Sequence, residues 1–598
     1  MKKKIYSLVI LLATALLTQA ANNASFNWFL AGGGSTGNDK SVDVATDADG
    51  NIFLASYFLK GARFNGDSIT GSQTVVNTLY QNNMLISKLS PEKTTLWSIY
   101  SNDGIVTPTA LATTPDGSLI LTATIKAITN TANQTTTAQL VDAVGTVSNF
   151  TGLSKSYTQS FVAKYNSNGE LQWLKELNSG ADKAKNVTTN SLACDASGNV
   201  YLTANFAATI IFPASTPDTL TSTNTSSAAV IAKLDGTTGD LVWAKTSSGG
   251  IKSENITALA YGDDGYLYAA GIFINIATPA TLTIGDKSFT PSTGTDVTLI
   301  RMDTNGDVSY IQNRTNTTLT VGGVKDVLAK NGKVFICGYF KGTIEIPDGT
   351  NLAAYSTSQN GYILAMDATT GADLWQKTET AAKGEADALC IGSDGNLYSL
   401  GVYFNKYSPL VIDIDFSNGF TFTDPSNVNG NGDMFLTSYN VSTGVVEEAH
   451  KVIQSTAADV ATGLVVFGDE LYLAGYTNGK PATFEDASTY SALGTSTSVS
   501  DFLLLDYTVT SPTTAITPHD DAKSPTAYAD NANHRLVVAN AEYVKYVELY
   551  DTTGRIISSA ANSGSSLTIG TQGIAPGVYI VKFATTNGST TSQRVIIR

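Results

Sequence analysis

The sequence predicts an all-β protein built from repeated four-stranded units, and three observations lead to that prediction. A pair of strands joined by a tight glycine turn recurs seven times, as in VATDADGNIFLASYF and LACDASGNVYLTANF. A third strand follows each pair, and in most copies a fourth strand carries an aromatic residue. The last copy lacks its fourth strand, whereas the chain opens with an unmatched one, FNWFL at residues 26–30. Together these features predict a seven-bladed β-propeller closed by an N-terminal strand, followed by a small Ig-like β-sandwich.

The first segment is typical of an export signal. Three lysines precede an apolar run, and Thr-Gln-Ala at residues 18–20 supplies a cleavage site, so residues 1–20 are predicted to be a signal peptide. The apolar run is too short to span a membrane, and no similar run follows, so we expect no transmembrane segment. The formal charge of -15 opposes binding to phosphate, so we expect no nucleic-acid partner.

Residues 21–508 are predicted to form the propeller. Alternation of side chains in NIFLASYF and KVFICGYF indicates strands, and the turn between the first two strands of each unit requires a positive φ. The fourth strands carry Trp97, Trp173, Trp243 and Trp375, and Tyr310 takes this place in the fourth unit. If residues 26–30 are the missing fourth strand, Trp28 occupies the same position and the last sheet loses its open edge.

The longest connections join second to third strands, at residues 126–159 and 405–432. In a propeller such loops emerge on one face, and long loops on a rigid scaffold are common binding sites. Aromatic rings there suit the apolar face of a sugar. The predicted binding residues are Phe150, Tyr157, Tyr407, Phe416, Phe420 and Phe422. The alternative is that these rings only pack the loops against the scaffold.

Two stretches of the repeats resemble known families. DASGNVYLTANF with AVIAKLDGTTGDLVWAKTSSGG resembles the seven-bladed repeats of secreted bacterial proteins often called SBBP repeats, which implies a propeller and no particular function. AMDATTGADLWQK is similar to the Trp-docking repeat of quinone-cofactor propellers. Those enzymes usually have eight blades and often a vicinal cysteine pair, whereas this sequence has seven units and no such pair. We therefore expect the tryptophans to pack in the core and no cofactor to bind.

A Pro-rich linker at residues 509–524 leads to a C-terminal domain, residues 525–598, whose short strands and Gly turns predict a β-sandwich. VELYDTTGR, APGVYIVKF and SQRVIIR resemble the type A sorting domain of type IX secretion, the Por secretion system, with the motif residues Gly554, Pro576, Gly577 and Tyr579. The resemblance implies recognition by the type IX machinery and passage across the outer membrane. An ordinary Ig-like binding module is the alternative.

Few residues suggest catalysis. Cys194, Cys337 and Cys390 are expected to be free thiols, and of the three histidines only His450 lies in the repeats, which is too few for the usual hydrolase or metal sites. Carboxylate chemistry is open to Asp43, Asp326 and Asp387, which are predicted near the channel mouth, although capping or solvated roles are the alternative. The loops DADGN and DTNGD lack the full ligand spacing of a calcium loop, so we expect no metal.

Ser68 and Thr219 stand in Asp-Ser/Thr-apolar triplets that resemble O-glycosylation sites of bacteria with type IX export. We predict a secreted, cell-surface, non-enzymatic binding or adhesion protein whose ligand is a carbohydrate or a host protein. The alternatives are a carbohydrate-active enzyme that uses carboxylates on the propeller and, more remotely, a quinone-dependent oxidoreductase.

Overall fold

The structure is a computed structural model of the 598-residue chain, which divides into two compact units, Met1–Ser511 and Pro512–Arg598. The predicted signal peptide and most of the predicted linker lie outside the described residues. The structure describes residues 23–597 except 35–37, 60, 66, 71–74, 77–78, 81, 129–136, 181–182, 184, 214–217, 223–226, 250–252, 276–280, 292, 317–321, 355–358, 379–382, 405–410, 414–420, 424–430, 456, 480, 492–499, 511–524, 540, 542–543, 552–553, 563–566 and 586–589.

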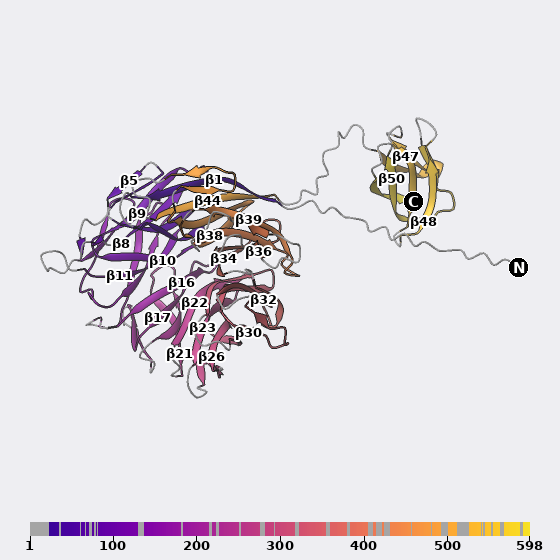
Figure 1. The fold of residues 1–598 in the computed structure, drawn as a ribbon. Helices are drawn as coiled ribbons and strands as arrows, with labels where there is room; N and C mark the ends of the chain where they lie inside the picture. Colours follow the sequence, from indigo (N-terminus) through magenta and orange to yellow (C-terminus); the bar gives the residue numbers. More distant parts are fainter. Residues whose placement is uncertain are drawn as a thin grey trace. The chain divides into compact units, whose positions relative to one another are not determined.

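Within these residues, the larger unit contains seven large antiparallel sheets that follow one another along the chain (Figure 1). The first strands are β2 (Lys40–Thr46), β10 (Ile105–Thr113), β16 (Val187–Cys194), β22 (Ser253–Tyr261), β28 (Gly322–Lys330), β34 (Lys383–Ile391) and β40 (Asp459–Phe467). The second strands are β3 (Ile52–Leu59), β11 (Leu119–Lys126), β17 (Val200–Phe206), β23 (Leu267–Asn275), β29 (Lys333–Phe340), β35 (Leu397–Phe404) and β41 (Glu470–Thr477). We number the sheets 1 to 7 in this order.

The outer half of each sheet completes the predicted four-stranded unit. The third strands are β8 (Asn82–Leu89), β14 (Gln159–Tyr165), β20 (Ala228–Leu234), β26 (Gly294–Met302), β32 (Asn360–Asp367), β38 (Gly432–Tyr439) and β44 (Asp501–Thr510). The fourth strands of sheets 1 to 6 are β9 (Thr95–Asn102), β15 (Leu171–Leu177), β21 (Leu241–Ser248), β27 (Val308–Asn316), β33 (Asp373–Thr378) and β39 (Val446–Gln454).

Strand β1 (Asn23–Gly33) is the fourth strand of sheet 7. It pairs antiparallel with β44 from Asn23 opposite Thr510 to Gly32 opposite Phe502. Figure 1 shows this indigo strand beside the orange end of the larger unit. The prediction that the N-terminal strand completes the last sheet is therefore confirmed.

The turns between first and second strands have the predicted backbone conformation. Their glycines all have positive φ, between 58° and 82°, a region that a residue with a Cβ enters at a cost. These are Gly50, Gly117, Gly198, Gly265, Gly332, Gly395 and Gly468.

The connections from second to third strands contain more regular structure than the sequence indicated. Five of them form a short hairpin that adds to the fourth strand of the preceding sheet. A fourth strand has an unpaired edge, and the hairpin covers that edge. The pairing strands are β4 (Gly61–Phe64) on β1, β12 (Ala138–Val141) on β9, β24 (Leu282–Ile284) on β21, β30 (Thr343–Glu345) on β27 and β42 (Ala482–Phe484) on β39.

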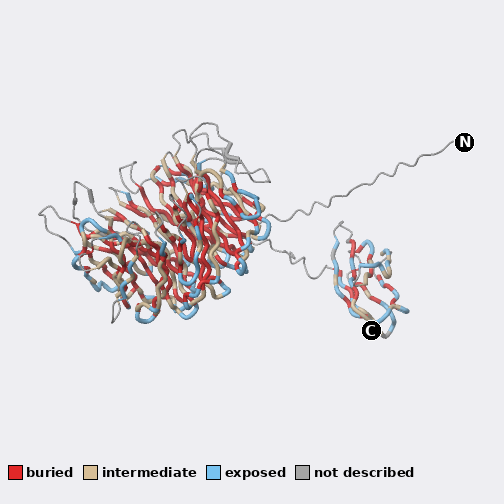
Figure 2. Tube along the Cα trace, turned by 90° about the horizontal axis from the view of Figure 1, so that it is seen from below, coloured by how far each residue is buried: buried red, intermediate tan, exposed pale blue. Residues whose placement is uncertain are grey.

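Most residues of the strands in the larger unit are buried, whereas exposed residues gather in the turns (Figure 2). Phe53 of sheet 1 shares a cluster with Phe161 of sheet 2, and Leu54 of sheet 1 shares another with Leu504 of sheet 7. The first strands also contact one another in sequence order, and β40 contacts β2. Contacts between sheets therefore lead from sheet 1 through sheet 7 and back to sheet 1.

The aromatic residue of each of five fourth strands docks on the next sheet. The indole N–H of Trp97 donates to the carbonyl of Ser167, 3.0 Å away, in the turn between β14 and β15. The ring lies against Gly169 of that turn, where a Cβ would come within 2.9 Å of it. Matching hydrogen bonds join Trp173 to Gly236, Trp243 to Thr304, Tyr310 to Ala368 and Trp375 to Val441. The predicted common position of the aromatics thus acts as a joint between sheets.

The smaller unit consists of two antiparallel sheets. One has the order β45 (Thr526–Asp530), β46 (Arg535–Ala539), β49 (Leu567–Gly570), and the other has β48 (Ile556–Ala561), β47 (Val544–Tyr550), β50 (Gly577–Thr585), β51 (Thr590–Ile597). Leu536 of the first sheet and Phe583 of the second belong to one buried cluster. The unit therefore has a hydrophobic core of its own.

Candidate functional site

A small chamber lies where the seven first strands meet. Each first strand has one irregularity in its register with the second strand, at which one residue leaves the ladder. Such a bulge turns a side chain away from the regular pattern. The seven bulged residues line one cavity of about 250 Å³ and are Val42, Thr109, Asn190, Thr257, Lys325, Asp387 and Thr462.

The residue after the bulge links one sheet to the next. Asp43 Oδ2 accepts a hydrogen bond from the backbone N–H of Leu111, 2.8 Å away. Asp326 Oδ2 accepts one from Leu389 at 2.9 Å, and Ser191 Oγ accepts one from Leu259 at 3.2 Å. The second oxygens of both carboxylates accept from the N–H of the following residue. The bonds to Leu111, Leu389 and Leu259 therefore connect neighbouring sheets around the chamber.

Burial changes the acidity of both carboxyl groups. It raises the pKa of Asp43 to about 6 and that of Asp326 to about 7, although the hydrogen bonds from backbone N–H groups lower both values. Burial disfavours a charged carboxylate because it removes water from around the charge. The pKa values of both carboxyl groups therefore lie close to neutral pH.

Asp387 carries the least satisfied charge in the chamber. Its Oδ1 atom pairs with the ammonium of Lys325 at 2.9 Å, and Lys325 also contacts Glu385 at 2.7 Å. The Asp387 Oδ2 atom is buried and has no hydrogen-bond partner among the described residues. Burial raises the pKa of Asp387 to about 6, against the opposite effect of Lys325. Burial lowers the pKa of Lys325, but the charges of Asp387 and Glu385 outweigh it and raise the pKa above its usual value.

The sequence placed Asp43, Asp326 and Asp387 near the mouth of a channel, and all three line this chamber. Asp43 and Asp326 accept hydrogen bonds from backbone N–H groups with both oxygens, and Asp387 forms an ion pair with Lys325. The sequence did not single out Lys325, because a lone lysine in a strand carries no signal until its partners are known. The chamber can accept a small polar molecule that donates to Asp387.

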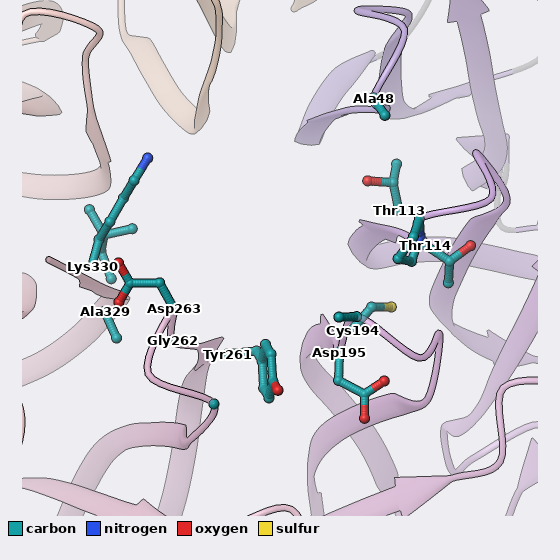
Figure 3. A pocket seen from close by; sticks show the side chains of 14 residues that line it. Ala48, Thr113, Thr114, Cys194, Asp195, Tyr261, Gly262, Asp263, Ala329 and Lys330 are labelled. Atoms are coloured by element: carbon teal, nitrogen blue, oxygen red, sulfur yellow. The ribbon is translucent and has the colours of Figure 1, made fainter. Parts of the chain in front are cut away.

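A wider pocket of about 680 Å³ lies at the turns that follow the first strands (Figure 3). Figure 3 shows Lys330 and Asp263 on one side and Cys194 with Asp195 on the other, with Tyr261 between them. Asp263 accepts a hydrogen bond from the backbone N–H of Asn331 at 2.9 Å. Burial above all raises the pKa of Cys194 to about 12, so its sulfur is a neutral thiol rather than a thiolate nucleophile at neutral pH.

The predicted free thiols are free in the structure. Cys337 and Cys390 are buried, and Cys194 is partly buried. Within the described residues no group of three or more His, Cys, Asp and Glu is placed to hold a metal ion. None of the helices among these residues is long and apolar enough to cross a membrane.

His450 lies in β39, the predicted fourth strand of the sixth unit. Its Nδ1 atom is 2.9 Å from Glu485, and its Nε2 atom is 3.1 Å from Glu448. Burial lowers the pKa of His450, but the hydrogen bonds to the two carboxylates outweigh it and raise the pKa to about 9. Glu448 also accepts from the backbone N–H of Ala24 in β1. The histidine is thus a charged link close to the N-terminal strand.

The predicted loop residues fall in different surroundings. Phe150 ends β13 (Val147–Phe150) in the hairpin on sheet 1, and its buried ring lies 5.1 Å from that of Phe161. Tyr157 is exposed over 39% of its surface. Tyr407, Phe416 and Phe420 lie outside the described residues, and Phe422 belongs to β37 (Thr421–Thr423), whose side chains are not among those described. Phe150 therefore has a packing role, and the binding role of the set stays a prediction.

The two glycosylation triplets are both in strands. Ser68 lies in β5 (Asp67–Thr70), whose side chains fall outside the described part. Thr219 lies in β19 (Asp218–Thr221) and is exposed, so a modifying enzyme could reach it. Modification of either residue stays a prediction.

The predicted sorting motif has structural roles in the smaller unit. Gly554 has φ of 82° in the turn between β47 and β48. Pro576 is exposed and precedes Gly577, the first residue of β50. The buried Tyr579 donates its hydroxyl to the carbonyl of Ala575 at 2.7 Å. Pro576, Gly577 and Tyr579 thus lie at the entry into β50, which is placed between β47 and β51, whereas Gly554 shapes the turn before β48.

The comparisons define the class of the protein through this unit. A family model described as "Secretion system C-terminal sorting domain" matches residues 531–598. The chain therefore carries a type IX sorting domain, and the protein is secreted by the type IX system to the cell surface or the extracellular space. This confirms the predicted sorting domain and the predicted location. Comparison with curated protein sequences gives no match.

Solved structures similar to the chain include a protein of unknown function from Dyadobacter fermentans, at 8% identity and TM-score 0.34, with 81% of this chain and 99% of that chain covered. Another is PorZ of Porphyromonas gingivalis, described as a surface component of the type IX secretion system, at 11% identity and TM-score 0.17, with 95% and 100% covered. A third is Sqt1 from Chaetomium thermophilum, at 10% identity and TM-score 0.34, with 87% and 97% covered. These TM-scores are too low to define the architecture of this chain, which follows from its own strand pairing.

Proposed function

We propose that the larger unit is a seven-bladed β-propeller and that the smaller unit is an Ig-like sandwich. The cyclic order of contacts between the first strands supports the propeller, because in that fold neighbouring blades pack around an axis and the last meets the first. The buried cluster that joins sheets 1 and 7 supports closure. The chamber lined by one bulged residue from every sheet then lies on the propeller axis.

On this scaffold we propose a non-enzymatic binding or adhesion protein that acts at the cell surface, with a carbohydrate or a host protein as ligand. One observation carries the proposal. Two of the three carboxylates on which catalysis would depend, Asp43 and Asp326, have both oxygens committed to backbone N–H groups, one in the same strand and one in the next sheet. A carboxylate with both oxygens hydrogen-bonded to the backbone stabilises the scaffold and is not free for catalysis. Rigid scaffolds with exposed loops commonly serve recognition.

A glycan and host-protein array probed with the purified mature protein tests this proposal. We expect saturable binding to a defined class of ligand and lower affinity in the variant Tyr157→Ala, with an unchanged melting temperature. If Tyr157→Ala lowers the melting temperature and leaves binding intact, the ring packs the loop and the binding site lies elsewhere. If no glycan or protein on the array binds, the proposal is wrong.

The raised pKa of Asp387, whose Oδ2 atom has no partner among the described residues, favours one second candidate, a carbohydrate-active enzyme, because general acids work best with a pKa near the working pH. Incubation with oligosaccharides and measurement of new reducing ends tests it. Release of reducing ends that stops in Asp387→Asn would favour the enzyme over the binding protein.

A further inference from the structure

The joint between sheets 7 and 1 departs from the pattern of the other joints. In four sheets the residue directly across from the docking aromatic is basic, namely Lys88, Lys164, Lys233 or Arg301. In sheet 7 the residue across from Trp28 is Asp506. The basic side chain comes instead from the turn of sheet 1, where the ammonium of Lys93 lies 4.1 Å from the centre of the Trp28 ring. The charges at this joint are therefore reversed.

The reversal leaves a donor and an acceptor without partners. The indole N–H of Trp97 reaches the turn of the next sheet, but that of Trp28 donates to no acceptor among the described residues. Asp506 is only 4% exposed, and its Oδ1 atom has no partner within the described part of the chain. This Oδ1 atom is buried, whereas the indole N–H of Trp28 is accessible and can donate to a bound molecule.

These groups line a pocket of about 590 Å³. The amide of Asn27 donates to Asp506 Oδ2 at 3.0 Å and to Glu470 Oε2 at 3.2 Å, so it holds the two carboxylates side by side. Phe467 adds an aromatic ring that is 36% exposed. The walls thus combine the three carboxylates of Asp469, Glu470 and Asp506 with an ammonium, an indole N–H and an exposed aromatic face.

We propose that this pocket binds a single saccharide unit, with its hydroxyl groups on Asp506, Glu470 and Lys93 and its apolar face on Phe467. Sugar hydroxyls both donate and accept, so one ring can donate to the carboxylates and accept from the indole N–H of Trp28 and the ammonium of Lys93. The volume lies in the range of small-molecule pockets. The inference rests on the proposed binding function but places the sugar at the turns between strands, at the opposite end of the sheets from the loop that holds Tyr157.

An organic or metal cation fits the pocket less well than a sugar. The ammonium of Lys93 already supplies a positive charge there, and the amide of Asn27 already donates to both carboxylates. Burial above all, with further contributions from the charge of Glu470 and from a hydrogen bond with it, raises the pKa of Asp506 to about 7, although the Asn27 amide and the charge of Lys93 lower it. A hydroxyl group can pair with this carboxyl group in either protonation state.

Titration calorimetry of the full mature protein tests the proposal, with glucose, galactose, mannose, N-acetylglucosamine and fucose as separate probes and CaCl₂ as a cation probe. We expect at least one sugar to bind. Asp506→Asn and Phe467→Ala should each lower its affinity at least about tenfold. Phe467 is exposed, so its variant keeps the proposal testable if Asp506→Asn fails to fold.

Tyr157→Ala is the control that separates this pocket from the proposed loop site. It should leave the affinity of the pocket unchanged, even if it abolishes array binding through the loop. The proposal is overturned if none of the five sugars binds, if only CaCl₂ binds, or if Phe467→Ala binds the sugar as well as the parent protein. Sugar binding lost in Tyr157→Ala and kept in Phe467→Ala also overturns it, while supporting the loop site.

Discussion

Replacement of Phe29 by Ala should loosen the packing of the N-terminal strand, which completes sheet 7, against the hairpin that extends sheet 6. The Phe29 ring stacks on Phe484 with centroids 4.0 Å apart and meets Tyr490 edge-on at 6.0 Å. Truncation of a fully buried Phe costs about 3–5 kcal/mol, and Phe29 is only partly buried, so about half of that is expected. The lost aromatic pairs add about 1 kcal/mol. The expected loss of unfolding free energy is therefore about 3 kcal/mol.

Urea unfolding of the mature protein measures this loss, with Leu96→Ala as the matched control. Leu96 lies in β9, the fourth strand of sheet 1, but is 51% exposed, so its truncation should change the unfolding free energy by less than about 0.5 kcal/mol. If Phe29→Ala costs no more than Leu96→Ala, β1 is not held by its side chains and the closure argument fails. Trp28 is only partly buried, so Trp28→Ala should cost less than the 3–5 kcal/mol expected of a buried ring.

Three further results are expected. His450→Gln should lower the unfolding free energy by about 2–3 kcal/mol at pH 6 and hardly at all at pH 10. The pKa of His450 is about 9 in the folded protein and about 6.5 when unfolded, so the stability it adds is complete below pH 6.5 and is lost as the pH rises through 9. An equal loss at both pH values would contradict the charged link. Gly169→Ala should cost about 1–2 kcal/mol more than Gly145→Ala in urea unfolding, because both glycines have positive φ but only the first abuts Trp97; equal costs would refute the docking role. Deletion of residues 531–598 should leave the protein in the periplasm, as judged by fractionation against the full chain, and its appearance at the surface would refute the sorting role.

Features that depend on a single unit of the repeat could be predicted from the sequence. The turn glycines, the strand pairs and the common place of the tryptophans each leave a local pattern, and the unmatched strand around Trp28 revealed its partner because the last unit lacked one. The short hairpins on the outer edges could not be predicted in this way. Strands such as β12 and β42 have three or four residues, too few to show alternation, and they form because a neighbouring sheet offers an unpaired edge.

The candidate site was predicted only in part, for a related reason. Asp43, Asp326 and Asp387 were placed near the axis because their strands are the first of each unit. Which of them has a free oxygen depends on a bulge in its own strand and on the backbone of the next sheet. Asp506 was missed, although an alignment of the third strands places it where Lys88, Lys164, Lys233 and Arg301 stand in other sheets.

The pairing of β1 with β44 has a consequence for the order in which the molecule is completed. Asn27 and Thr508, which are joined by a hydrogen bond across this pair, stand 481 residues apart in the chain. At a synthesis rate of about 5–20 residues per second, the earliest strand waits on the order of tens of seconds for its partner to be made. Until then β1 and the incomplete last sheet each have an unpaired strand edge, which can pair with another chain. Completion of the last sheet, rather than of any earlier one, is therefore the step that removes the unpaired edges of β1 and β44.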